Sequence, residues 1–156
     1  MVPWVTTDTH FFHEKIKEYE GRPDNFDELI IKYWKELVRP SDLIIHLGDV
    51  SFKGHQSPIR DLPGKKILVR GNHDPKSFLW YIKDGFDFCC DSFSLKYYGR
   101  NILFTHKPIR YVPVAYDLNI HGHVHTKRKS LVIEKQVAVR LEENEYKPVL
   151  LSSLVY

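Results

Sequence analysis

The sequence of 156 residues predicts an α/β protein, and two observations carry this prediction. Short apolar runs, typical of buried strands, alternate with segments whose apolar residues have helical spacing. Several of these runs then end abruptly in Gly, Asn, Asp or His. The clearest case is Lys66 to Val69, which is followed by Gly71-Asn72-His73-Asp74. Because open α/β sheets bind ligands beyond the carboxyl ends of their strands, this tetrapeptide is a candidate metal or phosphate site.

Length and composition are those of a single globular domain, which we expect to span residues 1–156. The hydrophobic and charged fractions, 42% and 28%, exclude a disordered or fibrous chain. A net charge of +3 suits an anionic substrate but is too small for a dedicated nucleic-acid binder.

The cysteines, the N-terminus and the lengths of the apolar runs indicate the cellular compartment. Cys89 and Cys90 are adjacent, and we expect them to be reduced because a disulfide between neighbours is strained. The N-terminus lacks the pattern of a secretory signal, and no apolar run approaches the roughly 18 residues of a membrane span. We therefore expect a cytoplasmic protein without a membrane partner.

The first predicted strand, Val2 to Thr7, ends in Asp8-Thr9-His10. Residues two apart in an extended chain point to the same side, so Asp8 and His10 can converge on one ion. A short helix follows, to about Tyr19. His13 at its start could reach the same site, and the alternative is a capping or solvent-facing histidine.

The next helix begins after Asp24 or Asn25 and runs to about Val38, with apolar residues at the spacing of a buried face. Arg22, in the loop before this helix, could bind a phosphate group, although an exposed loop arginine is the commoner case.

The second strand, Asp42 to Leu47, reads as buried on both faces and ends in Gly48-Asp49. His46, inside this run, is interpreted as a hydrogen-bonded core histidine. The remaining predicted elements are a helical turn at Ile59 to Leu62, the strand Lys66 to Val69, a helix at Lys76 to Lys83, and strand-like segments at Phe86 to Ser94, Leu95 to Tyr98, Asn101 to Thr105, Leu118 to Ile120, Leu131 to Ile133, Val137 to Leu141 and Pro148 to Leu154.

Polar side chains thus follow predicted strand ends at five places in the chain. The set comprises Asp8, His10, Asp49, Asn72, His73, His106, His123 and His125. Two carboxylates, an amide and several imidazoles, with no thiolate, suffice for two ions with mixed nitrogen and oxygen ligands. We expect two divalent metal ions, Mn²⁺ first, with Fe, Zn, Ni or Mg as the alternatives.

The ordered motifs Asp8-x-His10, Gly48-Asp49, Gly71-Asn72-His73-Asp74, His106 and Gly122-His123-x-His125 resemble those of the calcineurin-like metallophosphoesterase superfamily. The resemblance covers residues 8 to 125, and the chain is similar in size to short bacterial and phage members. It implies a four-layer α/β/β/α sandwich in which two mixed sheets are flanked by helices.

The same resemblance implies roles for the residues. Asp8, His10 and His125 would hold one metal, and Asn72, His106 and His123 the other. Asp49 would bridge the two metals, and His73 would be the acid that protonates the leaving oxygen. Many family members carry an Asp-Arg pair shortly after Gly-Asp, where this chain has Val50-Ser51-Phe52-Lys53, so the acidic partner of His73 stays open. His13, Arg22 and Asp74 are the candidates for substrate binding.

The expected activity is metal-dependent hydrolysis of a phosphate ester, with a phosphodiester favoured. Two adjacent ions can clamp a phosphoryl group and generate the attacking hydroxide, while a histidine with a pKa of about 6.5 protonates the leaving group. The alternatives are a nucleotide phosphomonoesterase, a nuclease, and a non-catalytic metal-binding scaffold on the same fold. The basic candidates for nucleic-acid contact are Lys107, Arg110, Lys127, Arg128 and Lys129. The oligomeric state is left undetermined.

Overall fold

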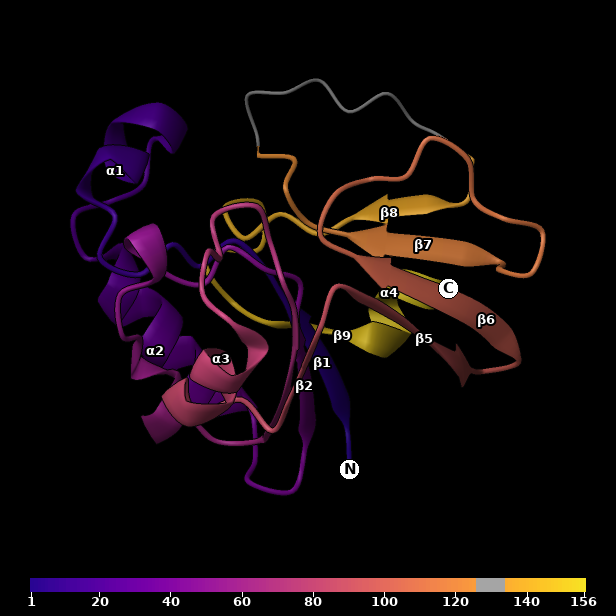
Figure 1. Ribbon diagram of the computed structural model, residues 1–156, viewed down its shortest axis with the longest axis horizontal. Coiled ribbons are helices and arrows are strands. Elements are labelled where there is room, and N and C mark those ends of the chain that lie inside the picture. Colours follow the sequence, from indigo (N-terminus) through magenta and orange to yellow (C-terminus); the bar gives the residue numbers. More distant parts are fainter. Residues whose placement is uncertain (126–133) are drawn as a thin grey trace.

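The computed structural model describes residues 1–125 and 134–156, and its strands form two sheets (Figure 1). The first sheet has the order β4-β3-β2-β1-β9, and the second has the order β5-β6-β7-β8. Each sheet contains both parallel and antiparallel pairs, which confirms the predicted class of two mixed sheets with helices. The strands are β1 (Pro3–Thr6), β2 (Leu43–His46), β3 (Lys65–Val69), β4 (Phe88–Cys90), β5 (Ser92–Tyr97), β6 (Arg100–Thr105), β7 (Leu118–His121), β8 (Gln136–Ala138) and β9 (Val149–Leu150).

Helices α1 (Glu14–Glu20), α2 (Phe26–Leu37) and α3 (Phe78–Asp84) lie on the side of the first sheet that faces away from the second (Figure 1). Helix α2 begins and ends where the sequence predicts, to within a residue. Its Phe26, Ile30 and Trp34 repeat every four residues, so they share one face and are buried against the sheet. This helix-to-sheet core is closed from the sheet side by Ile44 and Leu68.

A second core fills the space between the two sheets. Ile44 and Ile45 of β2 are both fully buried, Ile44 in the helix-side core and Ile45 in the inter-sheet core. This is the burial on both faces that the apolar run predicts, because successive strand residues point to opposite sides. Helix α4 (Leu151–Val155) adds its first and last residues to the inter-sheet core.

The structure differs from the sequence prediction at several boundaries: β8 ends at Ala138 rather than Leu141, and α3 begins at Phe78 rather than Lys76. The predicted break between Ser94 and Leu95 lies instead at Asp91, where the chain leaves β4 in the first sheet and enters β5 in the second. Apolar residues continue across this crossing, so periodicity alone does not reveal it. The predicted strand at Pro148 to Leu154 is wrong beyond Leu150, since α4 follows, and its buried residues lie four apart on one helix face.

The predicted strand at 131–133 lies outside the described residues. Cys89 and Cys90 are free thiols, as expected. In the part of the chain that the structure describes, no helix has the length and apolar character needed to cross a membrane.

Candidate metal centre

The predicted ligands gather where five strands end. Loops after β1, β2 and β3 of the first sheet meet loops after β6 and β7 of the second. Two groups of side chains result, and within each group the ligand atoms lie within 4.8 Å of one another. One group is Asp8, His10 and His125, and the other is Asp49, His106 and His123.

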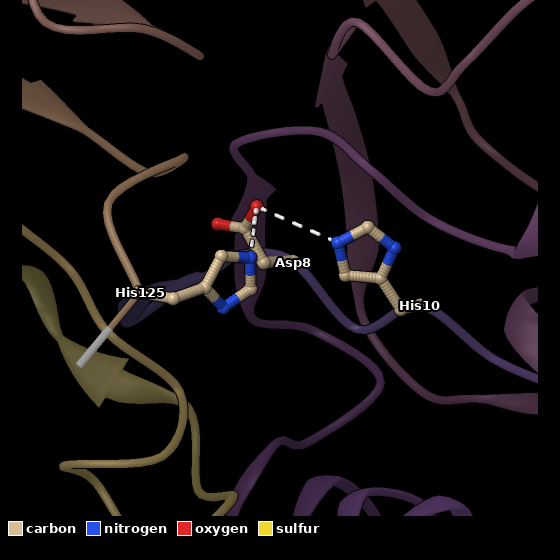
Figure 2. Close-up of side chains that lie close together, drawn as sticks. All are labelled: Asp8, His10 and His125. Carbon is tan, nitrogen blue, oxygen red and sulfur yellow. Dashed lines mark ion pairs between the residues drawn. The ribbon is translucent and has the colours of Figure 1, made fainter. Parts of the chain in front are cut away.

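In the first group, both histidines direct Nε2 at one oxygen of Asp8 (Figure 2). The distances from Asp8 Oδ1 are 3.9 Å to His10 and 3.7 Å to His125. Asp8 Oδ2 accepts hydrogen bonds from the Thr7 hydroxyl, at 2.5 Å, and from the His123 main-chain N–H, at 2.9 Å. Oδ1 is also buried, but it has no hydrogen-bond partner among the described residues. Atoms that each lie about 2.1 Å from a shared ion stand roughly 3–4 Å apart, so this orphaned oxygen and the two nitrogens fit a divalent metal.

In the second group, His106 is oriented by its other ring nitrogen. Its Nδ1–H donates to the Leu47 carbonyl at 2.6 Å, so Nε2 is turned into the site. This Nε2 lies 3.0 Å from Asn72 Oδ1 and 3.4 Å from Asp49 Oδ2. The His123 ring stands 5.0 Å from the His106 ring, centroid to centroid. An amide oxygen, a carboxylate and two imidazoles make a donor set of the kind that borderline and hard divalent ions accept.

Asp49 lies between the two groups. Its Oδ2 is 3.4 Å from His106 Nε2 on one side and 3.7 Å from His10 Nε2 on the other. Its Oδ1 accepts a hydrogen bond of 2.8 Å from the main-chain N–H of His73, which fixes the carboxylate plane. One carboxylate oxygen therefore faces both groups at once.

The protonation states suit a cation. Burial lowers the pKa of His10 well below its usual value, which keeps this imidazole neutral and ready to act as a ligand. Burial also works against a charged His106, but hydrogen bonding and attraction from Asp49, together with the Asp8 charge, raise the pKa of His106 to about 9. The negative charges of Asp8 and Asp49 thus stabilise a positive charge at this centre, even on a buried histidine.

The ligand loops hold strained backbone. Asp8, His10, Asp49 and His123 all have positive φ angles, of 48°, 47°, 57° and 66°. Such a conformation costs about 1 kcal/mol or more for a residue other than glycine, and it persists only where the surroundings enforce it. Here the two loops are joined by main-chain hydrogen bonds from Asp8 to Gly48, at 2.9 Å, and from His10 to Asp49, at 3.0 Å.

Gly48 shows how closely these loops pack. Its φ is +100°, and a Cβ at this position would lie 2.5 Å from the main-chain nitrogen of Gly71 and 2.7 Å from Nδ1 of His106. The Gly-Asp motif after β2 therefore needs glycine for two reasons, the left-handed backbone and the contact with the neighbouring ligand loop.

Asp74, a candidate for substrate binding, lies behind the site. Its carboxylate is buried and accepts main-chain hydrogen bonds from Asp49 and Gly71 at 2.7 Å and from Val50 at 2.9 Å. Burial raises the pKa of Asp74, although these three N–H groups oppose the shift. In this position the side chain fastens the β3 loop to the β2 loop, and the cavity walls do not include it.

Arg22, a second such candidate, is buried rather than exposed in its loop. Its guanidinium donates to the carbonyl oxygens of Asp8, at 2.7 Å, and Thr9, at 2.8 Å. Nε and the nitrogen that binds Asp8 also donate to Glu142 Oε1, at 2.9 and 2.7 Å. The structure therefore places Arg22 behind the Asp8 to His10 loop, where its contacts are with the protein itself.

His13 and His73 do reach the site. His13 caps helix α1 by accepting a hydrogen bond of 2.9 Å from the Ile16 N–H, and its ring lies 5.7 Å from the ring of His10. The His73 ring also lies 5.7 Å from that of His10. Both line a cavity of about 210 Å³ whose wall also includes His10 and His125 of the first group and Asp49 and His123 of the second.

His46 is confirmed as a core histidine. Its Nδ1 accepts from the Gly48 N–H at 3.1 Å, so the proton is on Nε2, which donates to the Thr9 hydroxyl at 3.0 Å. Burial lowers the pKa of His46 to about 3, which keeps the ring neutral. Through these two hydrogen bonds the ring links the loop after β1 to the loop after β2.

Glu142 is a residue of the site that sequence reasoning missed. Its Oε1 accepts from His125 Nδ1 at 3.1 Å as well as from Arg22, and the side chain is nearly buried. Burial alone raises its pKa, but the hydrogen bond from His125 and the charge of Arg22 lower it to about 2. Glu142 lies in a run of charged residues, and no spacing distinguishes it from Glu143.

The basic residues considered for nucleic-acid contact divide into two sets. Lys107 and Arg110 are exposed, whereas Lys127, Arg128 and Lys129 lie outside the described residues.

Comparisons with known proteins show the family of this chain. A sequence model of the calcineurin-like phosphoesterase family matches residues 1–146. The chain is 30% identical to an uncharacterised protein of Methanocaldococcus jannaschii, an alignment that covers 97% of this chain and 88% of the relative. It is 32% identical to the gene 66 protein of Mycobacterium phage L5 over 46% of this chain and 39% of the phage protein.

Two solved structures are similar to this chain in fold. A protein of unknown function from Aquifex aeolicus superposes with a TM-score of 0.83 at 28% identity, over 99% of this chain and 97% of that one. A novel archaeal phosphodiesterase superposes with a TM-score of 0.56 at 17% identity, over 90% and 82% of the two chains, which shows a shared fold. With two candidate metal-ligand groups at its strand ends and a family match over residues 1–146, the chain belongs to the calcineurin-like phosphoesterase family.

Proposed function

We propose that residues 1–156 form a single domain that hydrolyses phosphodiesters at a centre of two divalent metal ions. The observation that carries the proposal is the pair of carboxylate oxygens at the site. Asp8 Oδ1 is buried without a hydrogen bond among the described residues, and Asp49 Oδ2 faces a histidine of each ligand group. A buried carboxylate oxygen without a donor, such as Asp8 Oδ1, is costly unless a cation satisfies it, and Asp49 Oδ2 lies between the two groups, so these two positions support a metal at each group.

In this proposal Asp8, His10 and His125 hold one ion, and Asn72, His106 and His123 hold the other, with Asp49 shared. Such ions would supply positive charge for the phosphate oxygens and an activated water molecule. Mn²⁺ is the first candidate, because the donor set is nitrogen and oxygen without thiolate. His10 is in the neutral form that a metal ligand requires, whereas His106 directs Nε2 into the site and would release a proton when it binds a metal.

His73 is the proposed general acid. Its main-chain N–H donates to Asp49, while the residue lines the cavity that His10, Asp49, His123 and His125 also line. An imidazole placed there can donate a proton to the oxygen that leaves phosphorus. His13, on the same cavity wall, is proposed to contact the substrate.

Two observations support a diester over a monoester. The site opens into cavities on both sides of His73, which leaves room for a substituent beyond the phosphate. The archaeal protein of the same fold is described as a phosphodiesterase.

Chelator-stripped protein assayed with and without added Mn²⁺ tests the proposal. The substrates are bis-p-nitrophenyl phosphate and p-nitrophenyl phosphate. We expect Mn²⁺ to restore cleavage and the diester to be cleaved faster. If protein shown to bind two metal ions cleaves neither substrate, the proposed enzymatic activity is contradicted and a metal-binding scaffold is favoured.

A further inference from the structure

A second cavity adjoins the metal centre, and the function proposed above does not assign the chemical group that it binds. It has a volume of about 400 Å³, within the range of about 300–1,000 Å³ that is usual for small-molecule sites. It shares His13 and His73 with the cavity that holds His10 and Asp49. The other lining residues are Phe52, Lys53, Asn72 and Pro75. His73 therefore stands between the ligand groups and this second space.

The loop that carries Phe52 is fixed in place. The Phe52 N–H donates to the Phe11 carbonyl at 2.9 Å, and the Ser51 hydroxyl donates to the His55 carbonyl at 2.5 Å. At Gly54, with a φ of +67°, a Cβ would lie 2.9 Å from the Lys76 side chain, so the loop packs closely against the chain after the His73 motif.

The Phe52 ring is held from two sides. It meets the His13 ring edge-on, with centroids 4.6 Å apart and an interplanar angle of 87°. It also stacks with the His55 ring at 6.0 Å and 11°. An aromatic surface that is fixed before binding loses little conformational entropy when a second ring stacks on it.

The charge of this cavity is positive. Lys53 is exposed, has a φ of 51°, and places Nζ 5.2 Å from the centre of the Phe52 ring. In the described part of the chain it forms no ion pair, and the residues that line the cavity include no carboxylate. A strained lysine beside an aromatic ring, next to a candidate phosphate site, suits an aromatic group that carries negative charge.

We propose that this cavity binds the nucleoside part of the substrate, with the nucleobase against Phe52 and the phosphate toward the metal ligands. The inference rests on the proposed function, because it uses His73 as the acid. In the reaction the water oxygen forms a bond to phosphorus and the bond from phosphorus to a ribose oxygen breaks. The proton on His73 passes to that ribose oxygen, and a proton of the water passes to solvent. The ribose oxygen must then lie beside His73, and the cavity beyond His73 is the Phe52 cavity.

Two cyclic diesters test the assignment. Adenosine 2′,3′-cyclic phosphate and glycerol 1,2-cyclic phosphate contain the same five-membered phosphate ring, but only the first carries a base. We expect wild-type protein loaded with Mn²⁺ to prefer the adenosine substrate. In Phe52→Leu the ratio of the two kcat/KM values should fall at least about fivefold, the loss expected for one base–aromatic stack. Phe88→Leu, which changes an exposed phenylalanine on β4, should keep the wild-type ratio.

A binding measurement tests the cavity assignment independently of hydrolysis. Calorimetric titration of Mn²⁺-loaded protein with adenosine 3′-monophosphate and with glycerol 1-phosphate gives a second ratio, which should also fall in Phe52→Leu. Base-dependent binding that requires Phe52, without hydrolysis of either diester, would support the cavity assignment and contradict the phosphodiesterase. Hydrolysis of both diesters with ratios that Phe52→Leu does not change would overturn the cavity assignment and leave the phosphodiesterase in place.

Discussion

Glu142 Oε1 accepts a hydrogen bond of 3.1 Å from His125 Nδ1. The same oxygen accepts from Arg22, and Arg22 donates in turn to the Asp8 carbonyl at 2.7 Å. Through this chain of contacts one carboxylate orients a ligand histidine by its far nitrogen and holds the backbone of a ligand aspartate. Partners of this kind fix the ring orientation of a metal-binding histidine and raise its basicity.

Glu142→Gln is predicted to weaken Mn²⁺ binding by about 10- to 100-fold, the usual effect of losing a carboxylate that supports a ligand histidine. The amide keeps an acceptor for Arg22 but removes the charge that favours His125 as a donor. Calorimetric Mn²⁺ titration measures the change. The matched control is Glu143→Gln, at an exposed neighbour that pairs with Arg140, and it should bind Mn²⁺ as the wild type does. Equal affinities in the two variants would show that Glu142 does not support the metal site.

His73→Ala is predicted to retain metal binding while turnover of a phosphodiester falls by about 10²- to 10⁴-fold, the range for loss of a general acid. The variant keeps the main-chain N–H that holds Asp49, so the ligand geometry should persist. Metal content and kcat are measured on the same preparation. Lys35→Ala, at an exposed residue of α2 that lines neither of the two site cavities, is the control. Undiminished turnover in His73→Ala would show that His73 is not the acid.

Asp49→Asn is predicted to weaken Mn²⁺ binding at both sites, whereas His125→Ala weakens it at one. The reason is positional: Asp49 Oδ2 faces His10 and His106 of different groups, while His125 faces Asp8 alone among the ligand carboxylates. The number of Mn²⁺ ions bound per chain, measured by elemental analysis after limited chelation, distinguishes the variants. Identical stoichiometry in the two would argue against a shared carboxylate.

His46→Gln is predicted to change how stability depends on pH. Burial lowers the pKa of folded His46 to about 3, while the unfolded chain has a histidine pKa of about 6.5. Between these pH values His46 is protonated in the unfolded state but not in the folded state. The free energy of unfolding therefore decreases as pH falls from about 6.5 to about 3, by up to about 1.4 kcal/mol per pH unit. His46→Gln has no titrating group at this position, so this contribution to the pH dependence of its stability is absent.

Urea unfolding of both proteins at several pH values tests the prediction. At pH 7 the wild type should be the more stable, because His46 satisfies Gly48 and Thr9. This difference should narrow as the pH is lowered. A difference that does not vary with pH would mean that the ring does not stay neutral in the fold.

Local sequence is sufficient for the ligand loops because each motif is short. Asp8 and His10 lie two residues apart after β1, and Asn72 follows β3 within three residues, so strand ends and spacing determine their place. The residues that support the ligands follow no such rule. Arg22 and Asp74 were predicted from loop position to bind substrate, but the structure shows their contacts with carbonyl and N–H groups of the ligand loops.

The sequence by itself determined the alternation of strands and helices, the apolar face of α2, and a set of candidate nitrogen and oxygen ligands at five strand ends. These follow from periodicities of a few residues and from the chemistry of single side chains. Only the tertiary structure decided that Asp91 separates two sheets, that Glu142 reaches His125, and that Phe52 borders the cavity next to His73. Such contacts join residues far apart in the chain, and the packing of whole sheets and loops creates them.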